Sequence, residues 1–496
     1  SVFLKQVSPE TYAVLQEKLY RFPGFFVQPR TIRKYTQPIG AHILGYVGEV
    51  DKSVINKRPY YQSGDYIGIS GIEKAYEEVL RGKKGIKIYL VDVHNRIKGS
   101  YRDGRYDTSA VVGRNLTLTV DADLQAYGEQ LMEKKIGSIV AMEPKTGEVL
   151  SLVASPNYSP EFLVGRKRTK NYRKLSIDTL NPLFNRATMA QYPPGSTFKV
   201  INGLIARQEK RVSLYTKYYC DLGYYARGIH VGCHEHKSPL ALVGAIKNSC
   251  NAYFCHIYRK IIENPNYPSI QDAYTQWRSY VMSFGLGQKL NTDLPSEAKG
   301  IIPTANYYNE IYGKRGWNGK TIISMAIGQG EIGVTPLQLA NMVSAIANKG
   351  YYYTPHFVKE IQGESEISSR FKEKKYTQID SAHFEPIIDG MELAVSGGSG
   401  ATGWRARIND ITVCGKTGTA ENPHGDDHSV FIAFAPKEDP QIAVSVVVEN
   451  GGYGNTWAAP IARLMIEKYL KDTISYPALE DYVLKGDLIH GKQKEN

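Results

Sequence analysis

The chain has 496 residues, of which 42% are apolar and 22% are charged, as in an ordinary folded protein with room for more than one domain. Its 61 basic and 49 acidic residues give a net charge of +12, which suits an anionic partner such as a nucleic acid, a membrane surface or a charged polymer. The sequence has no dense Lys/Arg array or zinc-finger pattern, which argues against nucleic acid, and no apolar run of about 18 residues that would predict a transmembrane helix.

The first part of the chain predicts short strands at 42–47 and 86–91 between loops rich in Tyr, Lys, Arg and Gly. Residues 116–125 pass from an alternating strand pattern to a helix, with Asp121 as the predicted N-cap. Two β-branched runs around a Pro-Lys-Thr-Gly turn then predict a hairpin over 137–154.

The C-terminal part predicts two more strands at 429–435 and 442–448, followed by an amphipathic helix over 458–470. Strands from both ends of the chain around a helical middle indicate an α+β fold, an antiparallel sheet flanked by helices. The polar end of the chain, 486–496, is expected to fray.

The stretch Tyr192-Pro-Pro-Gly-Ser-Thr-Phe-Lys199 runs directly into an apolar helical pattern. This places Ser196 at a helix N-terminus, where free N–H groups and the macrodipole favour developing negative charge. Lys199 follows one turn later on the same face. A serine needs a base within reach to act as a nucleophile, and a desolvated lysine amine can be that base. Alone, the pattern also fits a serine N-cap followed by a solvated lysine.

Two further motifs support the catalytic interpretation, Ser249-Cys250-Asn251 and Lys416-Thr417-Gly418-Thr419, in the order that active-site serine β-lactam-binding enzymes use. Longer segments point the same way: Phe22-Pro-Gly-Phe-Phe, His42-Ile-Leu-Gly-Tyr-Val-Gly-Glu, Gly71-Ile-Glu-Lys, Pro182-Leu-Phe-Asn-Arg-Ala, Gly328-Gln-Gly-Glu-Ile-Gly-Val-Thr-Pro and Lys416-Thr-Gly-Thr-Ala-Glu. In these segments, which span nearly the whole chain, the sequence resembles the elongation-type class B penicillin-binding proteins.

The resemblance implies an extended N-terminal pedestal of the dimerisation type at 1–112, a transpeptidase domain at 113–472 and a C-terminal tail at 473–496. It also implies a single-pass inner-membrane anchor, absent from this chain, with the catalytic domain in the periplasm. The expected partners are peptidoglycan stem peptides, lipid-linked precursor, β-lactams, a membrane glycan polymerase and other elongation-complex proteins.

The same resemblance assigns catalytic roles and implies no cofactor for catalysis. Ser196 attacks the carbonyl of the penultimate D-Ala, and Lys199, kept neutral by burial and by the charge of Lys416, takes its proton. Ser249 relays that proton to the leaving amine, and Asn251 holds Lys199 and the substrate backbone.

The third motif is expected to bind substrate. Lys416, Thr417 and Thr419 face the terminal carboxylate, and Gly418 lets the strand edge approach the peptide closely. The backbone N–H groups of Ser196 and Thr419 form the oxyanion hole.

Simpler roles remain open for these residues. Ser249 and Asn251 also fit a helix cap, and Lys416-Thr-Gly fits an ordinary turn. Arg186 suits either the groove or an interior salt bridge, and Gln329 is a candidate for the cleft wall.

The five cysteines are Cys220, Cys233, Cys250, Cys255 and Cys414. In an oxidising compartment disulfides are the default. Cys220, Cys233, His236 and Cys250 also match a Cys₃His zinc site, and the resemblance implies a structural metal with one ligand inside the Ser-x-Asn motif. Zinc, disulfides and free buried thiols all remain open, as does the choice of His236 over His234.

The predicted function is peptidoglycan D,D-transpeptidation during cell elongation, through a serine acyl-enzyme that β-lactams would trap. A septal transpeptidase or a D,D-carboxypeptidase shares the three motifs, and a non-turnover β-lactam sensor or scaffold would keep them. A β-lactamase needs a deacylating base, and the sequence offers no identifiable one.

Overall fold

The computed structural model describes residues 7–22, 24, 25, 27, 32–94 and 96–491. The chain divides into two compact units. One consists of Ser1–Thr117, Tyr158–Asp178 and Glu360–Glu366, and the other of Leu118–Asn157, Thr179–Lys359 and Ile367–Asn496. Among the described residues no helix is both long and apolar enough to cross a membrane.

The first unit contains short elements around a small core of Val50, Tyr61 and Ile67. The buried Glu77 carboxylate organises its Gly-Ile-Glu-Lys region, accepting from the Tyr61 hydroxyl at 2.8 Å and from the Gly68 N–H at 2.7 Å. The helices and strands are α1 (Pro9–Gln16), α2 (Ala41–Leu44), β1 (Val47–Glu49), α3 (Lys52–Lys57), β2 (Tyr66–Gly68), α4 (Gly71–Ala75), α5 (Glu77–Leu80), β3 (Tyr89–Val91), β4 (Ile97–Ser100) and α7 (Arg168–Ser176).

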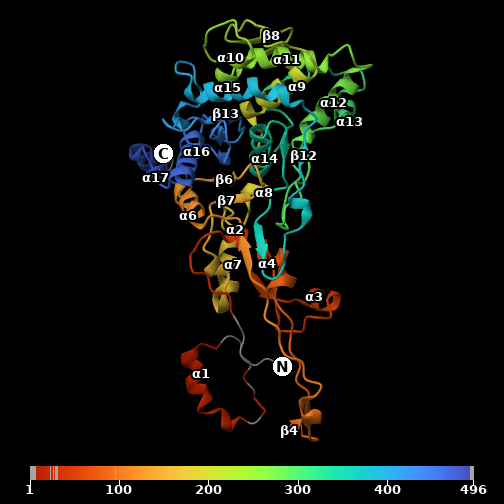
Figure 1. The fold of residues 1–496 in the computed structure, drawn as a ribbon, viewed down its shortest axis with the longest axis vertical. Coiled ribbons are helices and arrows are strands. Elements are labelled where there is room, and N and C mark those ends of the chain that lie inside the picture. Colours follow the sequence, from red (N-terminus) through yellow and green to blue (C-terminus); the bar gives the residue numbers. More distant parts are fainter. Residues whose placement is uncertain (1–6, 23, 26, 28–31, 95, 492–496) are drawn as a thin grey trace. The chain divides into compact units, whose positions relative to one another are not determined.

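A five-stranded antiparallel sheet forms the centre of the second unit, in the order β13-β14-β15-β6-β7. Of these strands, β13, β6 and β7 are labelled in Figure 1. Its strands are β6 (Gly137–Met142), β7 (Val149–Ser155), β13 (Cys414–Ala420), β14 (His428–Ala435) and β15 (Ile442–Val448). Because β15, late in the chain, pairs with β6, early in this unit, strands from both ends of the unit belong to one sheet. The predicted α+β sheet is thereby confirmed, and β13, which carries the Lys-Thr-Gly motif, lies at an edge.

Helices cover both faces of this sheet. On one face α6 (Ala122–Leu131) and α16 (Ala458–Lys471) pack against side chains such as Val444 and Val446. Ser445 points to the other face, where its hydroxyl donates to the Pro336 carbonyl of α14 (Pro336–Ala347) at 2.6 Å. Each fully buried valine contributes about 1.5–3 kcal/mol, so the apolar runs that predicted strands also form the core.

The helical middle carries two of the three motifs. The 3₁₀ turn η5 (Gly195–Phe198) leads into α9 (Lys199–Gln208), which packs against α11 (Asn251–Ile262) (Figure 1). The remaining helices and strands of this unit, some reaching its boundary with the first, are β5 (Leu116–Leu118), α8 (Arg186–Met189), β8 (Gly223–Ala226), β9 (Ile229–Gly232), α10 (Leu242–Lys247), α12 (Ile270–Ser283), α13 (Ala305–Tyr312), η6 (Ile323–Ile327), β10 (Tyr351–Tyr352), β11 (Val358–Ile361), β12 (Lys375–Tyr376), α15 (Phe384–Ser396) and α17 (Pro477–Lys485).

Most predicted elements are confirmed. The hairpin at 137–154 is β6 and β7, the helix at 458–470 is α16, and the Asp121 side chain caps α6 by accepting from the Leu124 N–H at 2.9 Å. The strand predicted at 42–47 is wrong except for Val47, which begins β1, because Gly40 and Gly45, both at positive φ, enclose the short helix α2. Of the strand at 86–91 only β3 forms.

The segment 473–496, expected as a tail, contains the helix α17, whose Leu479 and Val483 are buried. Residues 492–496 lie outside the described part of the chain, as do Pro23 and Phe26 of the Phe-Pro-Gly-Phe-Phe segment.

Candidate active site

The serine and lysine of the first motif lie where the helix begins. Ser196 is half-buried in the 3₁₀ turn η5, and Lys199 is the first residue of α9, with 0% of its surface exposed. The Thr197 hydroxyl closes the turn by donating to the Pro194 carbonyl at 2.7 Å. The predicted helix start is confirmed, with a first turn tighter than an α-helical one.

The second and third motifs meet Lys199 through one hydroxyl. The Lys199 Nζ donates to the Ser249 carbonyl at 2.6 Å, to Asn251 Oδ1 and, at 3.2 Å, to Ser249 Oγ. The Lys416 Nζ donates to the same Ser249 Oγ at 2.8 Å and to the Thr417 carbonyl at 2.9 Å. Segments far apart in the sequence therefore place two amines, a hydroxyl and an amide in one group.

The backbone of Ser249 is strained to reach this position. Its φ is 53°, in the left-handed region, which costs a residue with a side chain about 1–2 kcal/mol. The turn is held by the Cys250 N–H, which donates to the Ala245 carbonyl at 3.0 Å, and by Asn251 Nδ2, which donates to the Gly232 carbonyl at 2.6 Å. Strain of this kind persists where the surroundings fix the conformation, commonly at functional sites.

Both amines are harder to protonate than a solvated lysine. Burial lowers the pKa of Lys199 to about 8, against an opposing effect of the nearby cysteine sulfurs. Burial and then the charge of Lys199 hold the pKa of Lys416 well below its usual range. The expected repulsion between the two amines therefore lowers the pKa of Lys416, whereas burial lowers the pKa of Lys199.

The outer edge of β13 packs against η5, the turn that holds Ser196 and is called the nucleophile turn below. A Cβ atom at Gly195, whose φ is 55°, would lie 2.4 Å from the Thr419 carbonyl oxygen and 3.1 Å from its nitrogen. A Cβ at Gly418 would lie 2.9 Å from both the Pro194 oxygen and Thr197 Cγ2. The absence of a side chain at Gly418 therefore lets the nucleophile turn pack against the strand. That Gly418 also lets the strand edge approach the substrate peptide remains a prediction. Thr417 is buried and Thr419 half-buried.

Two residues left open by the sequence now have partners. Arg186 is buried and forms an ion pair with Glu449 at 3.2 Å, which fits the interior salt bridge. Gln329 Nε2 donates to the Thr419 carbonyl at 2.9 Å. Sequence reasoning missed Glu449, which also accepts from the Tyr192 hydroxyl at 2.7 Å. A carboxylate directly after the valine run of β15 was the available signal.

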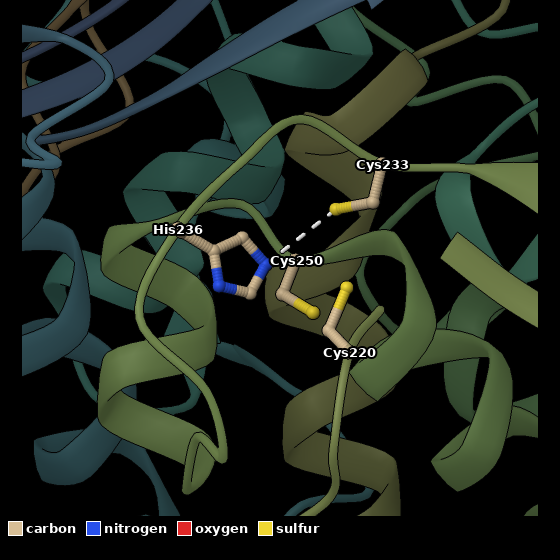
Figure 2. Close-up of side chains that lie close together, drawn as sticks. All are labelled: Cys220, Cys233, His236 and Cys250. Carbon is tan, nitrogen blue, oxygen red and sulfur yellow. Dashed lines mark hydrogen bonds between the residues drawn. The ribbon is translucent and has the colours of Figure 1, made fainter. Parts of the chain in front are cut away.

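Four side chains beside this group converge on one point (Figure 2). The ligand atoms of Cys220, Cys233, His236 and Cys250 all lie within 4.8 Å of one another. The hairpin of β8 and β9 brings Cys220 and Cys233 together, and Cys250 caps α11. His236, not His234, belongs to this set.

The donor set fits a tetrahedral zinc ion. Zinc–sulfur bonds of about 2.3 Å put tetrahedral ligands roughly 3.8 Å apart, so only small shifts separate the observed arrangement from a closed site. His236 Nδ1 lies 2.8 Å from the Lys237 carbonyl, which leaves Nε2 free, 3.6 Å from Cys233 Sγ. All five cysteines are free thiols, and Cys255 and Cys414 are buried elsewhere.

Hydrogen bonds favour the thiolate form, which a metal needs, at Cys233 but not at Cys250. The Asn251 N–H donates to Cys233 Sγ at 3.3 Å, and the Tyr253 N–H donates to Cys250 Sγ at 3.3 Å. A hydrogen bond from Cys250, with this backbone contact, lowers the pKa of Cys233 far below its usual range, while the same pairing raises the pKa of Cys250.

Comparison with known proteins agrees with this geometry. Residues 137–467 match the penicillin-binding protein transpeptidase domain, and residues 1–118 match the penicillin-binding protein dimerisation domain. The peptidoglycan D,D-transpeptidase MrdA of Acinetobacter baumannii is 30% identical, over 92% of this chain and 69% of that protein.

Solved structures give the same result. PBP2 of Pseudomonas aeruginosa in complex with WCK 5153 has a TM-score of 0.73 and 29% identity, covering 89% of this chain and 91% of that one. PBP2 of Helicobacter pylori in complex with MreC has a TM-score of 0.80 and 26% identity, covering 95% and 86%. The family and fold expected from the sequence are confirmed: the chain belongs to the penicillin-binding protein transpeptidases, as a serine-type D,D-transpeptidase of the elongation class.

Proposed function

We propose that this chain crosslinks peptidoglycan stem peptides during cell elongation through an acyl-enzyme on Ser196. One observation carries the proposal: the Ser249 hydroxyl is shared by the buried amines of Lys199 and Lys416, next to the turn that holds Ser196. We take Lys199, three residues after Ser196 in the chain, as the base for the serine, and the shared Ser249 hydroxyl as the proton path to a leaving group.

Acylation follows from these contacts. Ser196 Oγ attacks the carbonyl carbon of the penultimate D-Ala, and neutral Lys199 takes the hydroxyl proton. The N–H groups of Ser196 and Thr419 stabilise the oxyanion. The C–N bond breaks as Ser249 passes a proton to the nitrogen of the terminal D-Ala, which leaves. Asn251, which accepts from Lys199, keeps the amine aimed at this path.

Substrate binding and transfer use the β13 edge. The negative charge of the incoming terminal carboxylate favours the protonated form of Lys416, which binds it together with the Thr417 and Thr419 hydroxyls. Gly418 keeps the strand edge narrow there. An amine of a neighbouring stem peptide then attacks the acyl carbon, forms the crosslinking amide and frees Ser196. A β-lactam presents a carboxylate and a reactive amide to the same groups and acylates the same serine.

We further propose that Cys220, Cys233, His236 and Cys250 hold a structural zinc ion. Four protein ligands close the site, so zinc supplies rigidity and activates no water. Asn251 gains most, because its N–H donates to Cys233 Sγ and its Nδ2 to the Gly232 carbonyl beside that cysteine. Metal analysis should find one zinc per chain; quantitative disulfide with no zinc would exclude the site.

We propose the following domains, location and partners for this protein. Residues 1–112 are the pedestal, 113–472 the transpeptidase domain and 473–496 the C-terminal segment, of a protein anchored in the inner membrane with its catalytic part in the periplasm. The H. pylori relative is seen with MreC, so a scaffold of that kind and a membrane glycan polymerase are the proposed partners.

The test is labelling followed by synthesis. Fluorescent penicillin should leave a stable adduct on Ser196, mapped by mass spectrometry and absent from Ser196→Ala. With lipid-linked precursor and a glycan polymerase, the protein should give crosslinked peptide dimers. Loss of terminal D-Ala without dimers would indicate a carboxypeptidase, and an adduct without either product would indicate a sensor.

A further inference from the structure

The segment Gly328–Gly330 joins the nucleophile turn to the edge of β13. At one end the Gly195 N–H donates to the Gly328 carbonyl at 2.9 Å. At the other, Gln329 Nε2 donates to the Thr419 carbonyl at 2.9 Å. Gln329 is 8% exposed, so water does not readily replace this contact. One residue thus bridges the two segments whose N–H groups would stabilise the oxyanion.

The packing around this bridge leaves little room for adjustment. A Cβ at Gly328, whose φ is 71°, would lie 2.3 Å from the Gly195 carbonyl oxygen. Both the nitrogen and the oxygen of Thr419 face Gly195 at close range, since a Cβ there would lie 3.1 and 2.4 Å from them. The Thr419 oxygen and N–H belong to two successive peptide planes, and in a strand both groups of one residue point to the same edge. A donor that holds the oxygen at this edge therefore restrains the Thr419 backbone and, with it, the direction of the N–H.

The bridge is itself anchored to the helix that carries Lys199. Asn202 of α9 donates through Nδ2 to the carbonyls of Met325 (3.2 Å) and Ala326 (3.1 Å), in the turn η6 that leads to Gly328. Its Oδ1 accepts from Trp277 Nε1 at 2.9 Å. Gln329 is therefore held on a rigid base, which a positioning contact requires.

We propose that Gln329 is a positioning residue for acylation: its carboxamide sets the Thr419 peptide relative to Ser196 so that the oxyanion hole is formed before substrate arrives. This rests on the proposed function, since it assumes that Ser196 is acylated. A misplacement of about 1 Å in such a site can cost on the order of 100-fold in rate. Gln329 acts through Thr419 and does not touch the reacting atoms, so we expect its loss to lower the acylation rate constant about tenfold.

The test uses the acylation kinetics of the whole chain with fluorescent penicillin. Gln329→Met keeps the shape and removes the donor, and should lower the acylation rate constant about tenfold while leaving the affinity of the initial complex nearly unchanged. Gln329→Glu should be as slow at neutral pH. At low pH its protonated carboxyl can again donate, so its rate relative to wild type should rise as the pH falls.

Gln338 provides a matched control. Gln338 lies in α14 and is also a buried glutamine. Its Nε2 donates to two backbone carbonyls, that of Gln288 at 2.8 Å and that of Lys299 at 3.0 Å. Gln338→Glu should lower the thermal midpoint while the folded protein keeps its acylation rate constant. Thermal midpoints measured at each pH separate a stability effect from a kinetic one.

The outcomes are distinct. A wild-type or faster acylation rate in Gln329→Met, or a Gln329→Glu ratio that does not change with pH, would overturn the inference. If Ser196→Ala also lost no labelling, the proposed function would fail with it. If Ser196→Ala abolished labelling while Gln329→Met reacted normally, only the role of Gln329 would fail.

Discussion

Removal of the Ser249 hydroxyl should slow acylation about 10- to 100-fold. In Ser249→Ala, Lys416 loses its 2.8 Å hydrogen bond and keeps, among the described residues, only the Thr417 carbonyl. Lys199 keeps the Ser249 carbonyl and Asn251. Lys416 is 0% exposed, so solvent does not replace the lost partner. A hydrogen bond to a charged group contributes about 1.5–3 kcal/mol, which corresponds to this rate loss if it is expressed in the transition state.

A second variant separates chemistry from backbone strain. Ser249 has a φ of 53°, and Ser249→Gly removes the hydroxyl while relieving about 1–2 kcal/mol of strain. Stopped-flow acylation by a fluorescent penicillin, with thermal unfolding alongside, should show both variants equally slow and the glycine variant the more stable. Normal rates in both would refute a role for the shared hydroxyl, and a slow alanine with a normal glycine variant would assign the effect to the backbone.

Three further results are expected. The acylation rate should rise with pH, reach half its maximum near pH 8 and level off about one pH unit higher, because burial lowers the pKa of Lys199 to about 8 and only the neutral amine accepts a proton. A flat profile of rate against pH would contradict this. Gly195→Ala should acylate on the order of 100-fold more slowly, because its Cβ would meet the Thr419 oxygen at 2.4 Å. The control Gly313→Ala, at φ 77° with nothing within 4 Å of its Cβ, should keep its rate. Equal rates in the two variants would contradict a close packing of Gly195 on Thr419. Cys220→Ser should lose zinc, melt lower and acylate about tenfold more slowly than Cys255→Ser, a buried thiol outside the cluster; if zinc content is unchanged, Cys220 is not a ligand.

The sequence predicted the sheet well because its strands are strongly patterned. The runs of β6, β7, β14 and β15 are mostly apolar and each contains β-branched residues, and a closing helix follows β15. Short segments with a weak pattern were harder to predict. The segment 42–47 is largely apolar but follows Gly40 and contains Gly45, both at positive φ, and a run of that length fits a helical turn as well as a strand.

The motif residues were predictable because their chemistry is local, whereas their partners were not. Ser196 and Lys199 are fixed by one helical turn, and the choice of His236 over His234 needed the fold of the loop after β9. The contact of Gln329 with Thr419 joins residues 90 positions apart, which no pattern in the sequence encodes. The ion pair of Arg186 with Glu449 joins residues 263 positions apart.

The position of β13 has a consequence for solubility. An outer strand with open backbone groups is a template on which other chains can add and aggregate. Here the close packing of Gly195 on Thr419 and the Gln329 amide on its carbonyl shield that strand near its end. The turn that holds Ser196 therefore also blocks part of this edge and denies a second copy of the sheet a continuous ladder of backbone hydrogen bonds.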